Sequence, residues 1–190
     1  MKAVLMSIQP KWCELIARGK KTVEVRKSKP KLDVPFKCYI YMTAGDATYP
    51  VKKDGFPMIC HNNGGMSVIG EFVCDEIIVA ELGSYCKIPL KAAQLDAIGL
   101  MDYADDKTVY GWHISDLKIY DKPKELSEFY KYTEYDDSSK DIRPCRFCEH
   151  NKFDWSENCE YCDIDFDGEH CFHLQLKRPP QSWCYVEELR

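Results

Sequence analysis

Short stretches of alternating apolar and polar residues are the feature that most constrains the fold of this chain. The stretches "FKCYIYM" at 36–42 and "SVIGEFVCDEIIVA" at 67–80 have the period of two and the aromatic and β-branched content of strands. A glycine inside the second stretch, Gly70, predicts a β-bulge. Both stretches are bounded by polar or turn-forming residues, so the chain is predicted to be rich in short strands.

The rest of the chain supplies further strands and two short helices. A helix is predicted from a Ser7 cap to Gly19, where the glycine ends it, and a weaker one over residues 90–98. Glycine, proline and asparagine make residues 44–65 mostly loop. The remaining strands are predicted at residues 2–6, 22–27, 182–188 and, as one or two strands, 108–123. We therefore predict an α+β fold, a small and partly closed β-barrel with flanking short helices.

An acidic, cysteine-rich segment interrupts the β pattern. Residues 134–173 hold twelve Asp or Glu against four Lys or Arg, a formal charge of -8, whereas residues 1–37 hold ten Lys or Arg against three acids, a formal +7. The segment has poor periodicity and few aliphatic residues, so a hydrophobic core of its own is not enough to stabilise its fold. We predict a barrel domain at 1–132, an acidic insertion at 133–173, and a strand within 174–190 that completes the barrel.

The cysteines of this insertion form two CxxC pairs that suit a metal. Four thiolates satisfy tetrahedral zinc and leave no open position, so such a site is structural rather than catalytic. The predicted ligands are Cys145, Cys148, Cys159 and Cys162, with Cys171 and His173, or His150 and His170, as alternates. The alternative is that these cysteines are reduced thiols that bind no metal. The remaining cysteines are dispersed, and Cys13 and Cys38 are predicted to be core residues.

The sequence shows no apolar run long enough to span a bilayer and no signal-peptide pattern. We therefore expect a cytoplasmic protein with no membrane partner, in which cysteines stay reduced.

The stretch "GKKTVEVRKSKPK" at 19–31 concentrates positive charge around one glutamate. In an ideal strand, Thr22, Glu24 and Arg26 point one way and the intervening valines the other. Glu24 can orient the Arg26 guanidinium toward a phosphate or a planar base, while Lys21 acts as a mobile point charge. The alternative is that Glu24 only neutralises the neighbouring cations on the wall of the barrel and binds no ligand. The local charge favours a polyanion with salt-sensitive affinity.

These residues resemble the GxKxxExR signature of the ASCH (activating signal cointegrator homology) domains, relatives of the PUA RNA-binding fold. Gly19, Lys21, Glu24 and Arg26 occupy its positions. The flanks "SIQPKWCELIARGKK", "GEFVCDEI", "GWHISDLKIYDKPKEL" and "RPPQSWCYVEEL" are similar to family segments, the last to small bacterial and phage members. The resemblance covers about residues 1–130 and 174–190. It implies a PUA-type barrel whose signature residues line a cleft for RNA or a nucleotide-like ligand.

The resemblance also implies a candidate enzyme activity. Some small bacterial members are amidohydrolases that act on acylated cytidines, and a ribonuclease is reported. Their lysine and its neighbour are similar to Lys21 and Thr22, and their downstream glutamate to Glu71, but their threonine position is Glu24 here. A partly buried Lys–Glu pair could tune the lysine as a general base. The candidate catalytic residues are therefore Lys21, Glu24 and Glu71.

The favoured function is RNA or nucleotide binding, with amide or RNA hydrolysis as the alternative. The candidate ligand-binding residues are Gly19, Lys21, Thr22, Glu24, Arg26, Lys27 and Trp183. Base-stacking candidates are Trp12, Tyr41, Trp112 and Trp183, although Trp112 fits an alternating core strand. A third interpretation is a protein-interaction module whose acidic insertion docks a basic partner.

Overall fold

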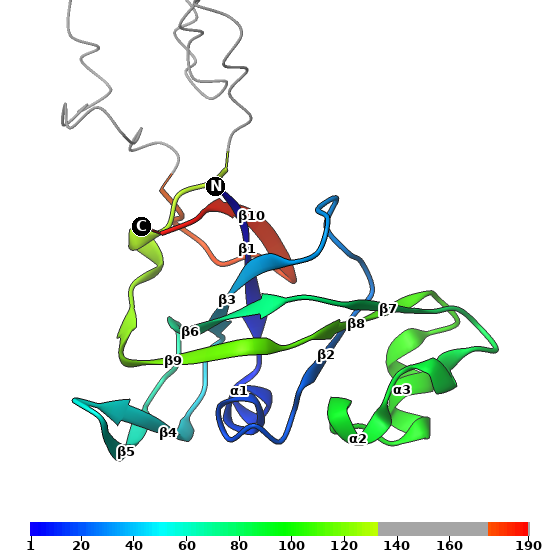
Figure 1. Ribbon diagram of the computed structural model, residues 1–190, viewed down its shortest axis with the longest axis horizontal. Helices are drawn as coiled ribbons and strands as arrows, with labels where there is room; N and C mark the ends of the chain where they lie inside the picture. Colours follow the sequence, from blue (N-terminus) through cyan, green and yellow to red (C-terminus); the bar gives the residue numbers. More distant parts are fainter. Residues whose placement is uncertain (133–174, 190) are drawn as a thin grey trace, which may run out of the picture.

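A computed structural model describes residues 1–132 and 175–189 as a mixed α+β fold with mostly strands (Figure 1). The strands are β1 (Lys2–Ile8), β2 (Val23–Arg26), β3 (Phe36–Met42), β4 (Ala47–Lys53), β5 (Phe56–Asn62), β6 (Ser67–Cys74), β7 (Ile77–Ala80), β8 (Val109–His113), β9 (Ser115–Lys124) and β10 (Trp183–Glu187). The helices are α1 (Pro10–Ala17), α2 (Leu90–Ala93) and α3 (Ala97–Ala104), with single 3-10 turns η1 (Tyr85–Lys87) and η2 (Leu126–Glu128). The predicted α+β class is thus confirmed.

A five-stranded sheet in the order β10-β1-β3-β6-β9 forms the centre of the molecule. Alternation along β1 sends Val4 and Met6 to one apolar cluster and Ala3 and Leu5 to another, on the opposite face. The two ends of the chain meet in this sheet, because β10 pairs antiparallel with β1.

The predicted bulge at Gly70 is confirmed. The pairing of β6 with β9 shifts register between Val68 and Gly70, and that of β3 with β6 shifts at Ile40/Tyr41. A Cβ at position 70 would lie 2.5 Å from the Lys118 carbonyl oxygen, so only glycine allows this approach of β9.

A three-stranded sheet in the order β2-β8-β7 lies beside the first. The chain runs from β6 into β7 through Asp75 and Glu76, and from β8 into β9 through Ile114, so two neighbouring strands pass from one sheet to the other. The sheet hydrogen bonds do not continue around the molecule, and the described strands form three sheets rather than a closed barrel. The structure does not show closure of a barrel in the described residues.

The prediction that residues 44–65 are mostly loop is wrong. Strands β4 and β5 form an antiparallel hairpin around Asp54 and Gly55, whose φ angles of 52° and 83° suit a tight hairpin turn. The Asp-Gly pair between alternating residues is a hairpin signal that the glycine and proline content obscured. Pro50 is tolerated because this sheet has only two strands.

The predicted helices are shifted. Strand β1 continues to Ile8, so the cap of the first helix is Gln9 and not Ser7, and the helix begins at Pro10. The second predicted helix is divided, since Gln94 takes a left-handed conformation after α2 and Asp96 caps α3 by accepting a hydrogen bond from Gly99 N at 2.6 Å. Figure 1 shows α2 and α3 beside the three-stranded sheet, and the β4–β5 hairpin at the other end. None of the helices in the described residues is long and apolar enough to cross a membrane.

Candidate functional site

Three charged side chains from the basic stretch meet inside the protein. The Lys21 Nζ lies 3.3 Å from Glu24 Oε2, and Arg26 Nη2 lies 3.0 Å from Glu24 Oε1. The three residues are only 3%, 6% and 8% exposed. Alternation along β2 produces this arrangement, because Val23 and Val25 point to an apolar cluster shared with α2 and α3. We call Lys21, Glu24 and Arg26 the charged cluster.

The turn after α1 places Lys21. Gly19 adopts a positive φ of 67° and donates its N–H to the Ile16 carbonyl, and the Lys21 N–H reaches the Leu15 carbonyl at 3.1 Å. The Lys21 Nζ then donates to the Ala93 carbonyl at 2.6 Å and lies 4.9 Å from the centre of the Trp12 ring. Burial lowers the pKa of Lys21, and Glu24 partly offsets this effect.

Arg26 joins parts of the chain that are distant in sequence. Its Nη2 donates to the Ser7 carbonyl at 2.6 Å, at the end of β1, and its Nη1 lies 3.4 Å from Ser182 Oγ, just before β10. These bonds fix the guanidinium plane, as recognition of a planar or phosphate group requires.

The charged cluster carries more positive charge than its own carboxylate neutralises. Within the described residues, Glu24 is the one carboxylate at ion-pair distance from Lys21 or Arg26. The buried Arg26 Nε has no hydrogen-bond partner there, and Glu24 Oε2 has its ion pair with Lys21 alone. A buried group with a formal charge of +1 and unmet hydrogen-bonding capacity is costly. It is also chemically suited to accept an anionic group.

Tyr103 and Lys27 lie beside the charged cluster at the surface. Tyr103, on α3, is 39% exposed, and its ring lies 5.4 Å from the Lys27 Nζ. Burial raises the pKa of Tyr103, Arg26 opposes this, and Glu24 adds to it, so the phenol lies within electrostatic range of both groups. Sequence reasoning missed Tyr103 because the helix was predicted to end at residue 98. An exposed aromatic on the second helical segment is the signal that could have found it.

The other predicted ligand-binding residues have structural partners. Trp183 is half-buried, donates its indole N–H to Ser28 Oγ at 3.0 Å, and packs 6.0 Å from Trp112. Thr22 joins two elements, since its N–H donates to the Ala92 carbonyl and its carbonyl accepts from Ile114 N–H. Among the stacking candidates, Trp112 and Tyr41 are core residues at 0% and 2% exposure, which leaves the half-buried Trp12 and Trp183.

Glu71 is not part of the charged cluster. It lies opposite Tyr39 in the β3–β6 ladder, on the sheet face of the second apolar cluster, whereas Lys21 packs over Trp12 beside the first. Its carboxylate accepts a hydrogen bond from the Tyr120 hydroxyl at 2.6 Å and lies 3.9 Å from Lys37 Nζ. The structure therefore pairs Lys21 with Glu24 and does not bring Glu71 to it.

The predicted zinc ligands lie outside the described residues. This applies to Cys145, Cys148, Cys159 and Cys162 and to all their alternates. Among residues 1–132 and 175–189, no group of three or more metal-binding side chains occurs. Cys13 and Cys38 are fully buried, as predicted for core cysteines, and burial raises the pKa of both thiols.

Comparison with known proteins supports the resemblance drawn from the signature. The sequence model of the ASCH domain matches residues 6–52, which include the whole charged cluster. The chain is also similar to crystal structures of an ASCH protein from Zymomonas mobilis. That protein is 23% identical with a TM-score of 0.48, over 66% of this chain and 77% of that one. A tyrosine-to-phenylalanine mutant of it gives 23% identity and a TM-score of 0.49, over 67% and 81%. No curated protein matches the sequence.

Proposed function

We propose, from the ASCH match over residues 6–52 and the geometry of the charged cluster, that this protein binds RNA or a nucleotide-like ligand. One observation carries the proposal: Lys21, Glu24 and Arg26 are buried together with an uncompensated positive charge, and Arg26 Nε has no hydrogen-bond partner among the described residues. An anionic ligand group next to Arg26 and Lys21 would balance that charge.

Each residue of the site has a role in this proposal. Arg26, oriented by Glu24 and the Ser7 carbonyl, presents its remaining N–H groups to a phosphate or to a base edge. Lys21 adds a compact point charge. Tyr103 offers a partly exposed ring for stacking, and Lys27 extends the positive surface next to it. The ligand thus approaches from the side of α3.

A matched pair of lysine variants tests the proposal. Lys21→Met removes the buried charge and keeps most of the side-chain volume, whereas Lys20→Met removes the adjacent exposed charge. We expect Lys21→Met to weaken binding of short labelled RNA between about tenfold and a hundredfold, the usual value of a charged hydrogen bond. Lys20→Met should change affinity much less. Equal affinities for wild type and a folded Lys21→Met protein would sink the proposal.

A second candidate function is hydrolysis of an acylated cytidine. The observation that favours it is the lowered pKa of Lys21, which increases the neutral, proton-accepting form. In this mechanism Lys21 takes a proton from water as the water attacks the amide carbonyl, and returns it to the leaving amine. Glu24, 3.3 Å away, would support Lys21, and Glu71 would act only from the other face of the sheet. Turnover of acylcytidine by wild type and none by Lys21→Met is the expected result; ribonuclease activity is assayed in the same way.

We also propose that the two bent sheets correspond to the partly closed barrel of PUA-like domains. Residues 133–173 remain a predicted zinc-binding insertion, supported by the two CxxC pairs at Cys145/Cys148 and Cys159/Cys162. Purified protein should contain stoichiometric zinc, and chelation should lower the melting temperature. The formal charge of -8 over residues 134–173 makes a basic protein the partner to seek by pull-down with the full chain.

A further inference from the structure

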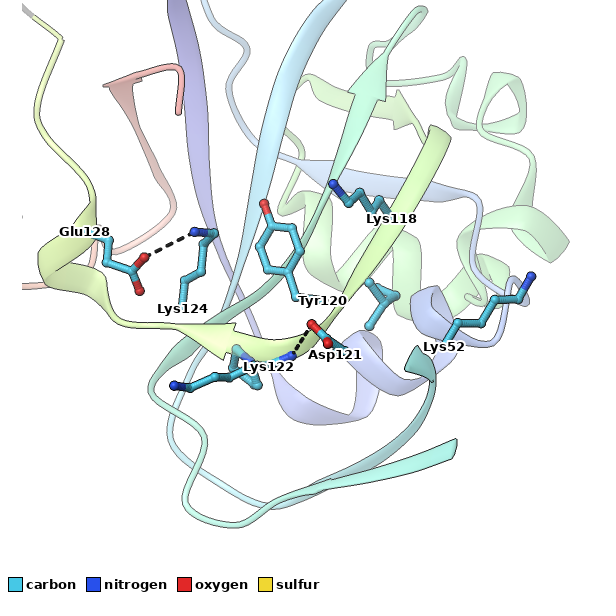
Figure 2. Close-up of a pocket in the computed structure, with 9 residues that line it drawn as sticks. Lys52, Lys118, Tyr120, Asp121, Lys122, Lys124 and Glu128 are labelled. Atoms are coloured by element: carbon cyan, nitrogen blue, oxygen red, sulfur yellow. Dashed lines mark hydrogen bonds and ion pairs between the residues drawn. The ribbon is translucent and has the colours of Figure 1, made fainter. Parts of the chain in front are cut away.

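A second positively charged region lies along β9, one of the two edge strands of the five-stranded sheet. A groove of about 470 Å³ follows this strand next to β4 (Figure 2). Its charged lining consists of Lys52, Lys118, Lys122 and Lys124 against Asp121 and Glu128, a formal charge of +2. In a chain with a net charge of -5, this is a marked local reversal of sign. We call it the β9 groove.

The acidic groups of the β9 groove are engaged by local bonds. Asp121 Oδ1 accepts the Lys122 N–H at 2.9 Å, and Glu128 Oε1 accepts the Glu125 N–H at 2.8 Å. Glu128 Oε2 also lies 3.2 Å from Lys124 Nζ. Both carboxylates therefore stabilise the chain around β9 and η2.

Lys52, Lys118 and Lys122 of the β9 groove can still attract an anionic ligand. Lys118 is 69% exposed, and its contact with Glu71 is long, at 4.0 Å. The Lys52 and Lys122 ammonium groups have no ion pair within residues 1–132 and 175–189, and both side chains are exposed. Point charges of this kind attract phosphate without selecting a base.

Tyr120 forms the fixed centre of the β9 groove. Its hydroxyl donates to Glu71 Oε2 at 2.6 Å, and its ring centre lies 5.9 Å from Lys118 Nζ and 5.8 Å from Lys124 Nζ. Figure 2 shows these two lysines on either side of the ring. Because Tyr120 is only 8% exposed, its ring faces are covered and do not offer a stacking platform for a base. Contacts in the groove are thus limited to a ligand's charged backbone.

We propose that the β9 groove binds the phosphodiester backbone of a single-stranded nucleic acid without reading its base sequence. A groove that follows a strand suits a linear polyanion, and Lys118, Lys122 and Lys124 of β9 all line it. The concave shape does not suit a flat lipid surface. The proposal is independent of the charged cluster, because Lys21, Glu24 and Arg26 do not line the groove.

Salt-dependent binding tests this site in the full chain. The probe is a labelled oligouridylate of about ten nucleotides, within the usual length of a single-strand site. The variant is Lys118→Gln/Lys122→Gln, which changes exposed side chains and should fold normally. We expect roughly tenfold weaker binding at low salt, and a slope of log affinity against log salt that is smaller by about 1.4. Lys87→Gln/Lys91→Gln, an equal loss of charge at the η1–α2 end, is the matched control and should keep the wild-type slope.

Several outcomes would overturn the proposal. Equal losses in the groove variant and the control would show that only net charge matters. An unchanged slope with new self-association would mean that the lysines merely protect an edge strand. Absence of oligouridylate binding by wild type, with or without binding to phosphatidylserine vesicles, would also refute it. Lys21→Met tests the charged cluster separately, because it leaves all lysines of the β9 groove in place.

Discussion

The charged cluster and the β9 groove are both positive, but they differ in how much water reaches them. Lys21, Glu24 and Arg26 are at most 8% exposed and fix one another at 3.0–3.3 Å. The Lys118 side chain in the β9 groove is 69% exposed, and its ion pair with Glu71 is long, at 4.0 Å. The charged cluster is therefore rigid and buried, whereas the lysines of the β9 groove are exposed to solvent.

This difference predicts different kinds of recognition. Buried charges interact strongly and are screened little by salt, so they can select one group in one orientation. Exposed lysines are screened within about 10 Å at 0.1 M salt, and they contribute affinity that depends on ionic strength rather than on shape. We therefore expect specificity from the charged cluster and sequence-independent affinity from the β9 groove.

The largest expected effect is the loss of stability when the Glu24 carboxylate is removed from the charged cluster. Removal of the Glu128 carboxylate from the β9 groove is the comparison. Glu24→Gln leaves Lys21 and Arg26 as buried cations without an anion, and should lower the free energy of unfolding by about 3–5 kcal/mol. Glu128→Gln removes the exposed partner of Lys124, whose side chain is 37% exposed, and should cost about 0.5 kcal/mol or less. Urea denaturation measures both values. Similar losses for the two variants would mean that the cluster is hydrated and the comparison fails.

A smaller effect is expected from the aromatic residue at the charged cluster. Tyr103→Ala should weaken binding of short RNA by about 1–3 kcal/mol if its ring stacks on a base, and Tyr103→Phe should retain affinity. Phe56→Ala, which removes a 73% exposed ring at the β4–β5 hairpin, is the control and should have no effect. Fluorescence anisotropy measures the affinities, and equal binding by the Tyr103→Ala and wild-type proteins would exclude stacking there.

The smallest effect concerns the dependence of stability on pH. Burial lowers the pKa of Lys21 in the folded protein, so between that pKa and the ordinary value of 10.5 the unfolded chain binds the proton more readily. The contribution of Lys21 to the free energy of unfolding therefore rises with pH across this window and is lost as pH falls through it. Tyr39, whose pKa burial raises to about 12, acts in the opposite direction at high pH.

The difference between wild type and Lys21→Met isolates the lysine, because Tyr39 contributes to both proteins. Thermal unfolding at a series of pH values should show wild type gaining stability relative to Lys21→Met as pH rises. A difference that does not vary with pH would show that Lys21 stays fully charged in the folded protein.

Local sequence rules predicted most strands, since alternation at residues 36–42 and 67–80 reports directly on which side chains are buried. They failed where two local signals competed. The Asp54-Gly55 turn was hidden by surrounding prolines and glycines, and the helix over residues 90–98 was divided at Gln94 and Asp96. Backbone conformation at these positions depends on one or two residues, whereas the prediction depended on the composition of a longer stretch.

Local sequence is enough to bring Lys21, Glu24 and Arg26 together, because they lie within six residues on a turn and one strand. Their burial, the contact of Ser182 with Arg26 and the place of Tyr103 near them depend on how distant parts of the chain pack together. Tertiary structure also separated Glu71 from Lys21 by placing the two on different sides of the central sheet. The physical reason is that strand alternation fixes the side on which a residue points, while the order and bending of strands fix what lies on that side.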